Sequence, residues 1–375
     1  MQIADISCSL LECDINQATQ RLEIMQEFMD RRINDSCWRP DGTFSIPINS
    51  KSTVSSSSNP ADFFRVEGGK LSLTLSWLPL QDLYILCYFL SSLTLSTKNS
   101  YDGHKAEKYL FEGISMLKGQ CITFSLSSIW TQFAHKLVTG SFTQPQETKE
   151  SLSSAGKRIE WRKTLYCNLL LHKVFLASAR SDWELASQTL EELRQKSKEL
   201  GEALPNTTQC LIQYVSGIIA QGTGDIINAL AAFDSPLLAL SPSTSKSRRN
   251  DPRRDTSILA ALNVILILRE PSHPSHTRLS QVMSLVEPFC QGTQNRYIQA
   301  AFYLVCATVQ TDSTIQTKQH LQQALQAANA INNTQILCIT LTFMSWKYFR
   351  GVVGQQSEKS AMAGRAVAKK ANDAL

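Results

Sequence analysis

The sequence predicts an all-α protein in which helical hairpins stack into a superhelix, and a repeated motif carries that prediction. Four times an Asp is followed four residues later by Ala and, after four more, by a large apolar residue. The motifs are Asp14-Ala18-Leu22, Asp102-Ala106-Leu110, Asp182-Ala186-Leu190 and Asp225-Ala229-Phe233. The composition agrees, because 43% hydrophobic and 18% charged residues allow a chain of 375 residues to bury a substantial core.

The spacing of this motif has a physical reason. An Asp at a helix N-cap accepts hydrogen bonds from free backbone N–H groups, and its charge suits the positive end of the helix dipole. Steps of four residues keep the Ala and the large residue on one face of the helix. The small residue lets a neighbouring helix approach, and the large one fills the space one turn later. Each motif therefore predicts the second helix of a helix-turn-helix pair.

In the first part of the chain, the predicted helix pairs are separated by polar insertions. Residues 1–31 are expected to form a pair that divides near Glu12–Asp14. Residues 39–78 are an insertion, in which a Ser/Pro/Asn-rich loop precedes an alternating segment that predicts a β-hairpin at Gly68-Gly69. Further along, the expected elements are a helix pair at 79–95 and 102–118, an extra helix at 124–138 and a polar linker at 140–156.

The clearest pair in the sequence spans residues 208–221 and 225–234. Gly217 allows close crossing of two helices, and Ala229 and Phe233 follow at the spacing of a tetratricopeptide repeat (TPR). The match is position for position within this pair. It predicts that the repeated unit of the chain is TPR-like.

The remaining predicted pairs complete the array. After the clearest pair, residues 235–255 form a third insertion, rich in Ser, Pro and Arg. The other pairs are 158–179 with 182–200, 256–269 with 277–290, 296–310 with 315–330, and 334–350 with 355–371. The prediction is one TPR-like α-solenoid over residues 1–375, with about seven helix pairs and three loop insertions. Such scaffolds usually bind other proteins.

One segment dominates the net charge of +5. Residues 246–254 carry five basic residues and one acidic residue, and the rest of the chain is nearly balanced, which argues against a general nucleic-acid surface. The segment is a candidate nuclear-localisation signal, nucleic-acid contact or phosphorylation-controlled element, and the alternative is a solvated insertion. Its basic residues are Lys246, Arg248, Arg249, Arg253 and Arg254.

The cysteines and apolar segments indicate a reduced, aqueous compartment. The ten Cys contain no C-x-x-C pair and mostly lie in apolar helical contexts. The N-terminus has Asp5 and no basic segment, so no signal peptide is expected. The longest apolar stretches, such as Ile258–Leu268, are too short to span a bilayer. We therefore expect a soluble protein of the cytosol or nucleus.

No group of residues predicts catalysis, a metal site or a cofactor. His273 and His276 have a spacing that could suit a metal, but they lie in a Pro-rich segment without Cys or acidic neighbours. The sequence GTGD lacks the Lys-Ser/Thr of a phosphate-binding loop. No Ser or Cys has the surroundings of a nucleophile elbow. We expect a non-enzymatic protein without a small-molecule substrate.

A run of large side chains near the C-terminus is a candidate interface. Residues 346–350 are Trp, Lys, Tyr, Phe and Arg in succession, and on a helix they point in all directions. Some of them must therefore face a partner or a groove. Aromatic and Arg side chains are favoured anchors at interfaces, whereas Phe233, Phe289 and Phe302 are expected to fill the core.

The C-terminal sequence resembles a known family. The run NNTQILCITLTFMSWKYFRGVVGQQSEKSAMAGRAVAKKAND is similar to the cohesin loading factor family, the TPR subunit of the complex that loads cohesin onto chromosomes. The resemblance extends back through KQHLQQALQAANAINNTQ and, more loosely, to the N-terminal QATQRLEIMQEFMDRRINDSCWRPDGTFSIPIN. Family members normally have more repeats upstream and continue past the position of Leu375, which leaves open whether the chain is a fragment or a truncated gene model.

The resemblance implies a partner and a place in the cell. It implies a superhelix that wraps the extended N-terminal segment of a much larger HEAT-repeat loader subunit. Contact with cohesin and chromatin would then be indirect, the location nuclear, and membranes not involved. A long concave groove suits an extended peptide on physical grounds as well. Because first helices of repeats usually line that groove, helical phase selects as candidates Tyr214, Gln221, Gln299, Phe302, Trp346, Lys347 and Arg350.

Two other binding functions fit the sequence. One is a different TPR adaptor, such as a chaperone co-factor that clamps an acidic C-terminus, which would need Lys or Arg at successive concave positions. The candidates here are mostly Gln and aromatic. The other is an α-solenoid that binds DNA or RNA through residues 246–254, for which binding would weaken with salt and with the loss of the Arg side chains.

Overall fold

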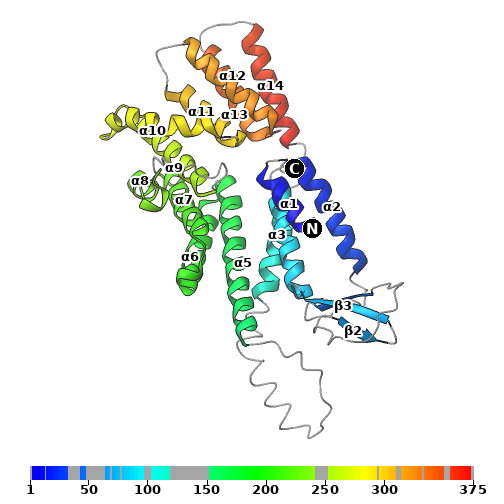
Figure 1. The fold of residues 1–375 in the computed structure, drawn as a ribbon. Helices are drawn as coiled ribbons and strands as arrows, with labels where there is room; N and C mark the ends of the chain where they lie inside the picture. Colours follow the sequence, from blue (N-terminus) through cyan, green and yellow to red (C-terminus); the bar gives the residue numbers. More distant parts are fainter. Residues whose placement is uncertain are drawn as a thin grey trace.

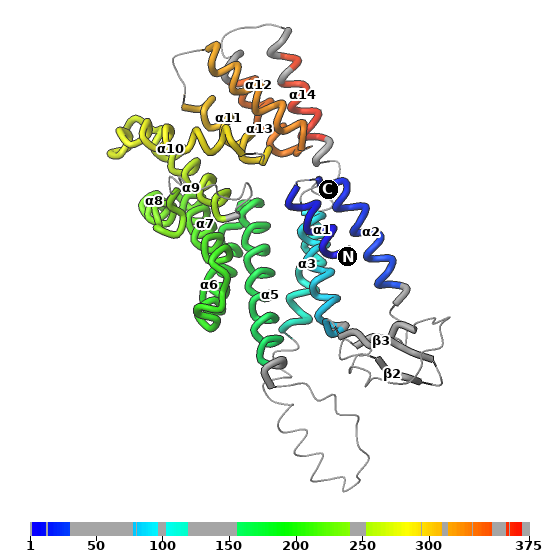
Figure 2. Tube along the Cα trace, viewed as in Figure 1, coloured from blue at the N-terminus to red at the C-terminus, as the bar shows by residue number. Residues whose placement is uncertain are grey.

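The computed structural model describes most of the helical part of the chain (Figures 1 and 2). The described residues are 2–12, 14–32, 43–47, 64–67, 70–76, 78–96, 103–118, 152–240, 252–293, 295–309, 314–331, 333–349 and 355–372. The helix expected at 124–138 lies outside the described residues, as does Asp102 of the second motif.

Helices dominate the structure, as the sequence predicts. They are α1 (Gln2–Leu11), α2 (Ile15–Arg32), α3 (Leu80–Ser96), an unlabelled helix at 103–118, α5 (Leu152–Ala179), α6 (Trp183–Leu200), α7 (Asn206–Gly222), α8 (Ile226–Phe233), α9 (Pro252–Leu268), α10 (Leu279–Gly292), α11 (Arg296–Val309), α12 (Thr314–Ala330), α13 (Thr334–Phe349) and α14 (Gln355–Asn372). Short 3₁₀ turns follow α6, follow α8 and precede α10. The all-α prediction is confirmed.

A small antiparallel sheet lies between α2 and α3 (Figure 1). Its strands are β1 (Thr43–Pro47), β2 (Phe64–Glu67) and β3 (Lys70–Ser76), in the order β1-β3-β2. In the β2–β3 hairpin Glu67 pairs with Lys70 across the Gly68-Gly69 position. Strand β1 falls within a segment that the sequence analysis assigns to loop. The sheet leaves the helical class of the fold unchanged.

The Asp-Ala-large motif behaves as its spacing predicts. Asp14 accepts a hydrogen bond from the backbone of Gln17 at 3.0 Å, and Asp182 and Asp225 accept the equivalent bonds at 3.1 and 3.2 Å. The Ala and the large residue of all four motifs are buried. Three of the four Asp are therefore confirmed as N-caps, and each motif turns its small-and-large face into the core.

The helices pack as successive pairs joined through their first members. Helix α1 contacts α3, α3 contacts α5, and the same relation continues through α7, α9, α11 and α13. Each second helix packs against its own first helix, as α6 does on α5 and α14 on α13. The buried clusters overlap along the array, because Leu86 borders two of them and Leu279 another two. This arrangement is compatible with the expected solenoid.

Two helices begin earlier than the sequence analysis expects. Helix α5 begins at Leu152, inside the presumed linker 140–156, and α9 begins at Pro252, inside the presumed insertion 235–255. Proline is well suited to the first turn of a helix, because it lacks only an N–H that would have no helical partner there. In α5 the Ser- and Gly-containing start has low helix propensity, but the long apolar face that follows supports it.

Candidate protein-binding groove

Close packing in the α7–α8 pair fixes the position of both helices. A Cβ atom added to Gly217 would lie 2.4 Å from Phe233 Cε1, so the Phe233 ring occupies the space that any side chain at position 217 would need. Ala229 is fully buried beside it. The turn between the helices contains Gly224, whose φ of 85° lies in the left-handed region that glycine adopts readily.

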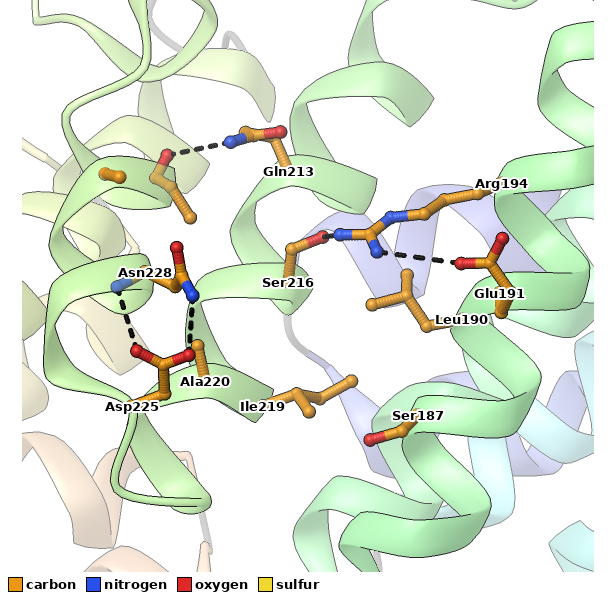
Figure 3. A pocket seen from close by; sticks show the side chains of 12 residues that line it. Ser187, Leu190, Glu191, Arg194, Gln213, Ser216, Ile219, Ala220, Asp225 and Asn228 are labelled. Carbon is orange, nitrogen blue, oxygen red and sulfur yellow. Dashed lines mark hydrogen bonds and ion pairs between the residues drawn. The ribbon is translucent and has the colours of Figure 1, made fainter.

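An open groove of about 580 Å³ lies where α6 and α8 flank α7 (Figure 3). Most of its lining is polar. Each of the three helices contributes, with Ser187, Leu190, Glu191 and Arg194 from α6, Gln213, Ser216, Ile219 and Ala220 from α7, and Asn228, Ala231 and Ala232 from α8, together with the cap residue Asp225. The groove is thus built by two consecutive helix pairs.

One wall of the groove is organised around Arg194. Its Nη2 donates a hydrogen bond to the Ser216 hydroxyl at 2.9 Å, which links α6 to α7, and its Nη1 lies 3.8 Å from a Glu191 carboxylate oxygen (Figure 3). The arginine is therefore held across the groove while part of its guanidinium stays exposed. Its remaining N–H groups can donate to the carbonyl groups of a bound peptide.

The opposite wall carries amide side chains. Asn228 Nδ2 donates to Asp225 Oδ2 at 2.6 Å, and the Asn228 backbone N–H donates to the other oxygen of the same carboxylate. Gln213 Nε2 donates to the carbonyl of Ala232 at 3.2 Å, at the C-terminal end of α8. Each amide retains an acceptor oxygen. The groove therefore offers both donors and acceptors, the requirement for holding an extended backbone.

The two groove candidates on α7 lie on another face of that helix. The Tyr214 hydroxyl accepts a hydrogen bond from Asn263 of α9 at 3.4 Å, its ring packs 6.0 Å from that of Phe233, and burial raises the pKa of Tyr214 to about 12. Gln221 is half-buried and does not line the groove. Tyr214 thus joins successive pairs, while Gln213 and Ser216 face the groove.

On α11 one candidate residue is buried in the core, which corrects the prediction, and another is held by local hydrogen bonds. Phe302 is 2% exposed and packs in the core formed by α9, α10 and α11, so its side chain is not available to a partner. A phenyl ring at this position gains more from burial against its neighbours than from facing water. Gln299 donates to the Thr293 carbonyl at 2.7 Å and accepts from Arg296 at 2.8 Å. Both of its amide ends are therefore engaged locally.

Of the three candidate residues near the C-terminus, the structure describes the side chain of one. Trp346 lies on α13 with 55% of its surface exposed, and its ring centre is 5.8 Å from that of Phe343. Lys347 lies within α13, but its side chain falls outside the described part, and Arg350 is outside the described residues. Trp346 is therefore the one member of this group that the structure shows at the surface.

The basic segment is divided by the start of α9. Arg253 and Arg254 belong to the first turn of that helix and not to a loop, because the helix begins at Pro252. The Arg254 guanidinium stacks 4.8 Å from the centre of the Phe289 ring. This contact is a cation–π interaction that ties α9 to α10. Lys246, Arg248 and Arg249 lie outside the described residues.

The two histidines of the HPSH segment make hydrogen bonds to nearby backbone groups. His276 Nδ1 is 2.7 Å from the carbonyl of Leu268 at the end of α9, and His273 Nδ1 accepts from the backbone N–H of Ser275 at 3.1 Å. In the described part of the chain, no group of three or more His, Cys, Asp or Glu is arranged to hold a metal ion.

A comparison with protein families decides what this helical array is. The family model described as cohesin loading factor matches residues 1–375, the whole chain. The chain belongs to the cohesin loading factor family. No curated protein and no solved structure matches it.

Membership of the cohesin loading factor family assigns the chain a role in cohesin loading. The family consists of loaders and is not a known enzyme family. Among the described helices, none is long and apolar enough to cross a membrane.

Sequence reasoning missed the residues that line the observed groove of this cohesin loading factor. Gln213, Ser216 and Ala220 do follow each other at helical spacing and form a stripe of polar and small residues on α7. That stripe is visible in the sequence. What the sequence does not reveal is that Arg194 and Asn228, from two other helices, stand on either side of it.

Proposed function

We propose that this chain is the non-enzymatic scaffold subunit of a cohesin loader. In this proposal it binds the extended N-terminal segment of the large HEAT-repeat loader subunit, and through that subunit promotes cohesin loading on chromatin in the nucleus. The observation that carries the proposal is the family match over the entire chain. The continuous row of helix pairs supports it, because a solenoid offers a long surface to an extended peptide.

We propose that the groove between α6 and α8 is the binding site for part of that segment. Its volume of about 580 Å³ and its open form suit several extended residues. Arg194 and the amides of Gln213 and Asn228 would pair with the peptide's backbone groups, which otherwise lose hydrogen bonds to water on binding. Two of the residues selected by helical phase, Tyr214 and Phe302, pack against neighbouring side chains, so this groove replaces them as the binding site in the proposal.

The test is a steric block in the groove. Ala231 is exposed and lines the groove from α8, so Ala231→Trp adds bulk there without entering the core. The matched control is Ala179→Trp, at an exposed position at the end of α5. Both variants are co-expressed with the N-terminal segment of the large loader subunit from the same organism. Complex formation is measured by gel filtration and by titration.

We expect the wild-type chain and Ala179→Trp to form a stable one-to-one complex, and Ala231→Trp to bind at least about tenfold more weakly, roughly 1.4 kcal/mol. No complex with the wild-type chain would contradict the scaffold function. If both variants bind equally well, the proposed partner stands, but the groove between α6 and α8 is not its binding site. Thermal melts of the free variants check that each one folds.

A further inference from the structure

Near the C-terminus, basic side chains outnumber the acidic groups that could pair with them. Upstream, basic residues pair across helices, as Arg162 does with Asp82, Lys118 with Glu192 and Arg278 with Asp234. Residues 296–372 contain eight Lys or Arg and only two Asp or Glu. In the described part of this region, four exposed cations form no ion pair: Lys318, Lys359, Arg365 and Lys369.

An apolar stripe runs along α13, the helix against which α12 and α14 pack. Ile339 is 58% and Trp346 55% exposed, and their spacing of seven residues places them on one side of the helix. Apart from Lys347, α13 carries no charged residue, and its apolar residues are spread around all its sides. A helix of that kind is normally covered all round. Helices α11, α12 and α14 cover only part of it.

Close packing of α14 on α13 brings the two features together. The Gly364 backbone lies against α13, where an added Cβ would be 3.5 Å from Leu341 Cβ and 3.9 Å from the Thr342 nitrogen. Thr342 is exposed and lies between Ile339 and Trp346 along the stripe. Arg365, next to Gly364, therefore emerges level with the middle of the stripe. Figure 1 shows α12, α13 and α14 grouped at one end of the molecule.

The outer side of α14 also carries exposed apolar and basic side chains. Met362, Arg365 and Lys369 follow one another at spacings of three and four residues, which places them on one face. Met362 is 56% exposed. We call the set Ile339, Trp346, Met362, Arg365 and Lys369 the C-terminal patch. It combines three large apolar side chains with two exposed cations.

We propose that the C-terminal patch binds an acidic stretch of the loader subunit's extended segment, one that carries large apolar side chains among Asp and Glu. This inference rests on the proposed function and adds the chemistry of the partner at the end of the array. The cations require an anionic partner, because charges of one sign attract the opposite sign and repel their own. The apolar stripe requires side chains to bury, which a phosphate backbone would not supply.

Each half of the patch makes its own contribution. Trp, Met and Arg are over-represented among the residues that anchor protein interfaces, so Trp346 is the expected hot spot. The exposed cations act at longer range and mainly speed association, which makes their effect sensitive to salt. Binding should therefore weaken as the salt concentration rises, and this dependence should be lost or inverted when the cations are replaced by Glu, because salt screens the resulting repulsion.

The experiment titrates the full chain with the labelled N-terminal segment of the large loader subunit, at about 50 and 300 mM salt. The charge variant is Arg365→Glu with Lys369→Glu, and its control is Lys198→Glu with Arg269→Glu, which changes the net charge equally at exposed positions outside the patch. The apolar variant is Trp346→Ala, and its control is Leu285→Ala on α10. A second version of the labelled loader segment, in which the acidic residues are replaced by Lys, is titrated in the same way.

We expect both patch variants to bind the segment about tenfold more weakly, the charge variant to lose or invert the salt dependence, and both controls to bind within about twofold of wild type. The Lys-substituted segment should prefer the Glu variant. If the wild-type chain fails to bind the segment, the proposed function fails. If it binds while the patch variants match their controls, only this inference is overturned. Salt-dependent binding of a DNA duplex, lost in the charge variant while segment binding stays intact, also overturns it.

Discussion

Gly217 shows how one missing side chain sets the geometry of a helix pair. Its Cα faces the Phe233 ring, and a methyl group there would lie within 2.7 Å of three ring carbons. A rigid aromatic ring in a packed core cannot yield without displacing its own neighbours. The glycine is thus required by packing and not by its backbone conformation, since it lies within α7.

This packing makes Gly217→Ala destabilising. We expect a loss of about 1–3 kcal/mol in the free energy of unfolding, the range for an overpacked core. Gly156→Ala in α5 is the control, because nothing lies within 4 Å of the added Cβ, and it should be neutral or slightly stabilising. Denaturant titration measures both. A Gly217→Ala protein as stable as the wild type would show that the α7–α8 crossing is looser than the Phe233 contact implies.

His172 is the residue whose burial gives the fold a dependence on pH. It lies on α5, 9% exposed, with its ring centre 6.2 Å from that of Phe89 and its Nε2 without a hydrogen-bond partner. Burial lowers the pKa of His172 to about 4, against a small opposing effect from its bond to the Ser92 backbone. The folded state therefore holds this imidazole neutral at pH values where the unfolded chain would protonate it.

The sign of the effect follows from that order of pKa values. Below about pH 6.5 the His172 imidazole is protonated in the unfolded state but stays neutral in the folded state. The free energy of unfolding therefore falls as the pH drops towards about 4. From about pH 7 to about pH 5 this one group removes roughly 2 kcal/mol. We expect His172→Leu to abolish that part of the decline between about pH 7 and 5, and His104→Leu, at an exposed site, to retain it. Equal slopes in denaturant titrations of the two variants would contradict the burial of His172.

At the scale of elements, a buried ion pair joins α3 to α5. Arg162 Nε and Nη2 donate to the two oxygens of Asp82 at 2.7 and 2.9 Å, and Asp82 is fully buried. The chain between these helices is long, so this bidentate contact fixes how the second and third helix pairs meet. Each charge of the pair is compensated by the other.

Breaking this pair should therefore be costly, and removing both partners should be less so. Asp82→Ala removes the buried carboxylate that holds the largely buried Arg162, and we expect a loss of about 3–5 kcal/mol. The double variant Asp82→Leu with Arg162→Met should recover much of it. As a control, Glu199→Gln in the exposed Lys196–Glu199 pair should cost less than about 1 kcal/mol. Chemical denaturation of all three variants checks this, and a double variant as unstable as Asp82→Ala would mean that the residues act separately.

The sequence predicted elements well where local physics decides them. The Asp caps, the buried Ala and the large residue of each motif are encoded within one helix, and they appear as expected at Asp182 and Asp225. Boundaries set by distant packing were missed, as at Leu152 and Pro252, where a polar composition suggested a linker. Strand β1 was missed because its partner β3 lies more than twenty residues away in the sequence.

At the scale of the whole molecule, the candidate site was the least predictable part. The groove arises because α6 and α8 lie on either side of α7, a relation between two pairs that no single helix encodes. Helical phase selected Tyr214 and Phe302, and both serve the core, since an aromatic residue that could face a groove can equally fill an interior. Trp346 is the candidate that the structure leaves at the surface.

The array also predicts how stability is distributed along the chain. Among the described helices α14 packs mainly against α13, whereas α7 contacts α5, α6, α8 and α9. In stacked repeats each unit is stabilised by its neighbours, so a helix with few neighbours opens most readily. Hydrogen exchange should therefore be fastest in α14 and slowest in α5 and α7. Addition of the loader subunit's N-terminal segment, with its proposed acidic stretch, should slow exchange in α13 and α14 of the wild type. The same addition should not slow it in Trp346→Ala. Uniform protection across all helices would instead mean that the chain unfolds as one cooperative unit.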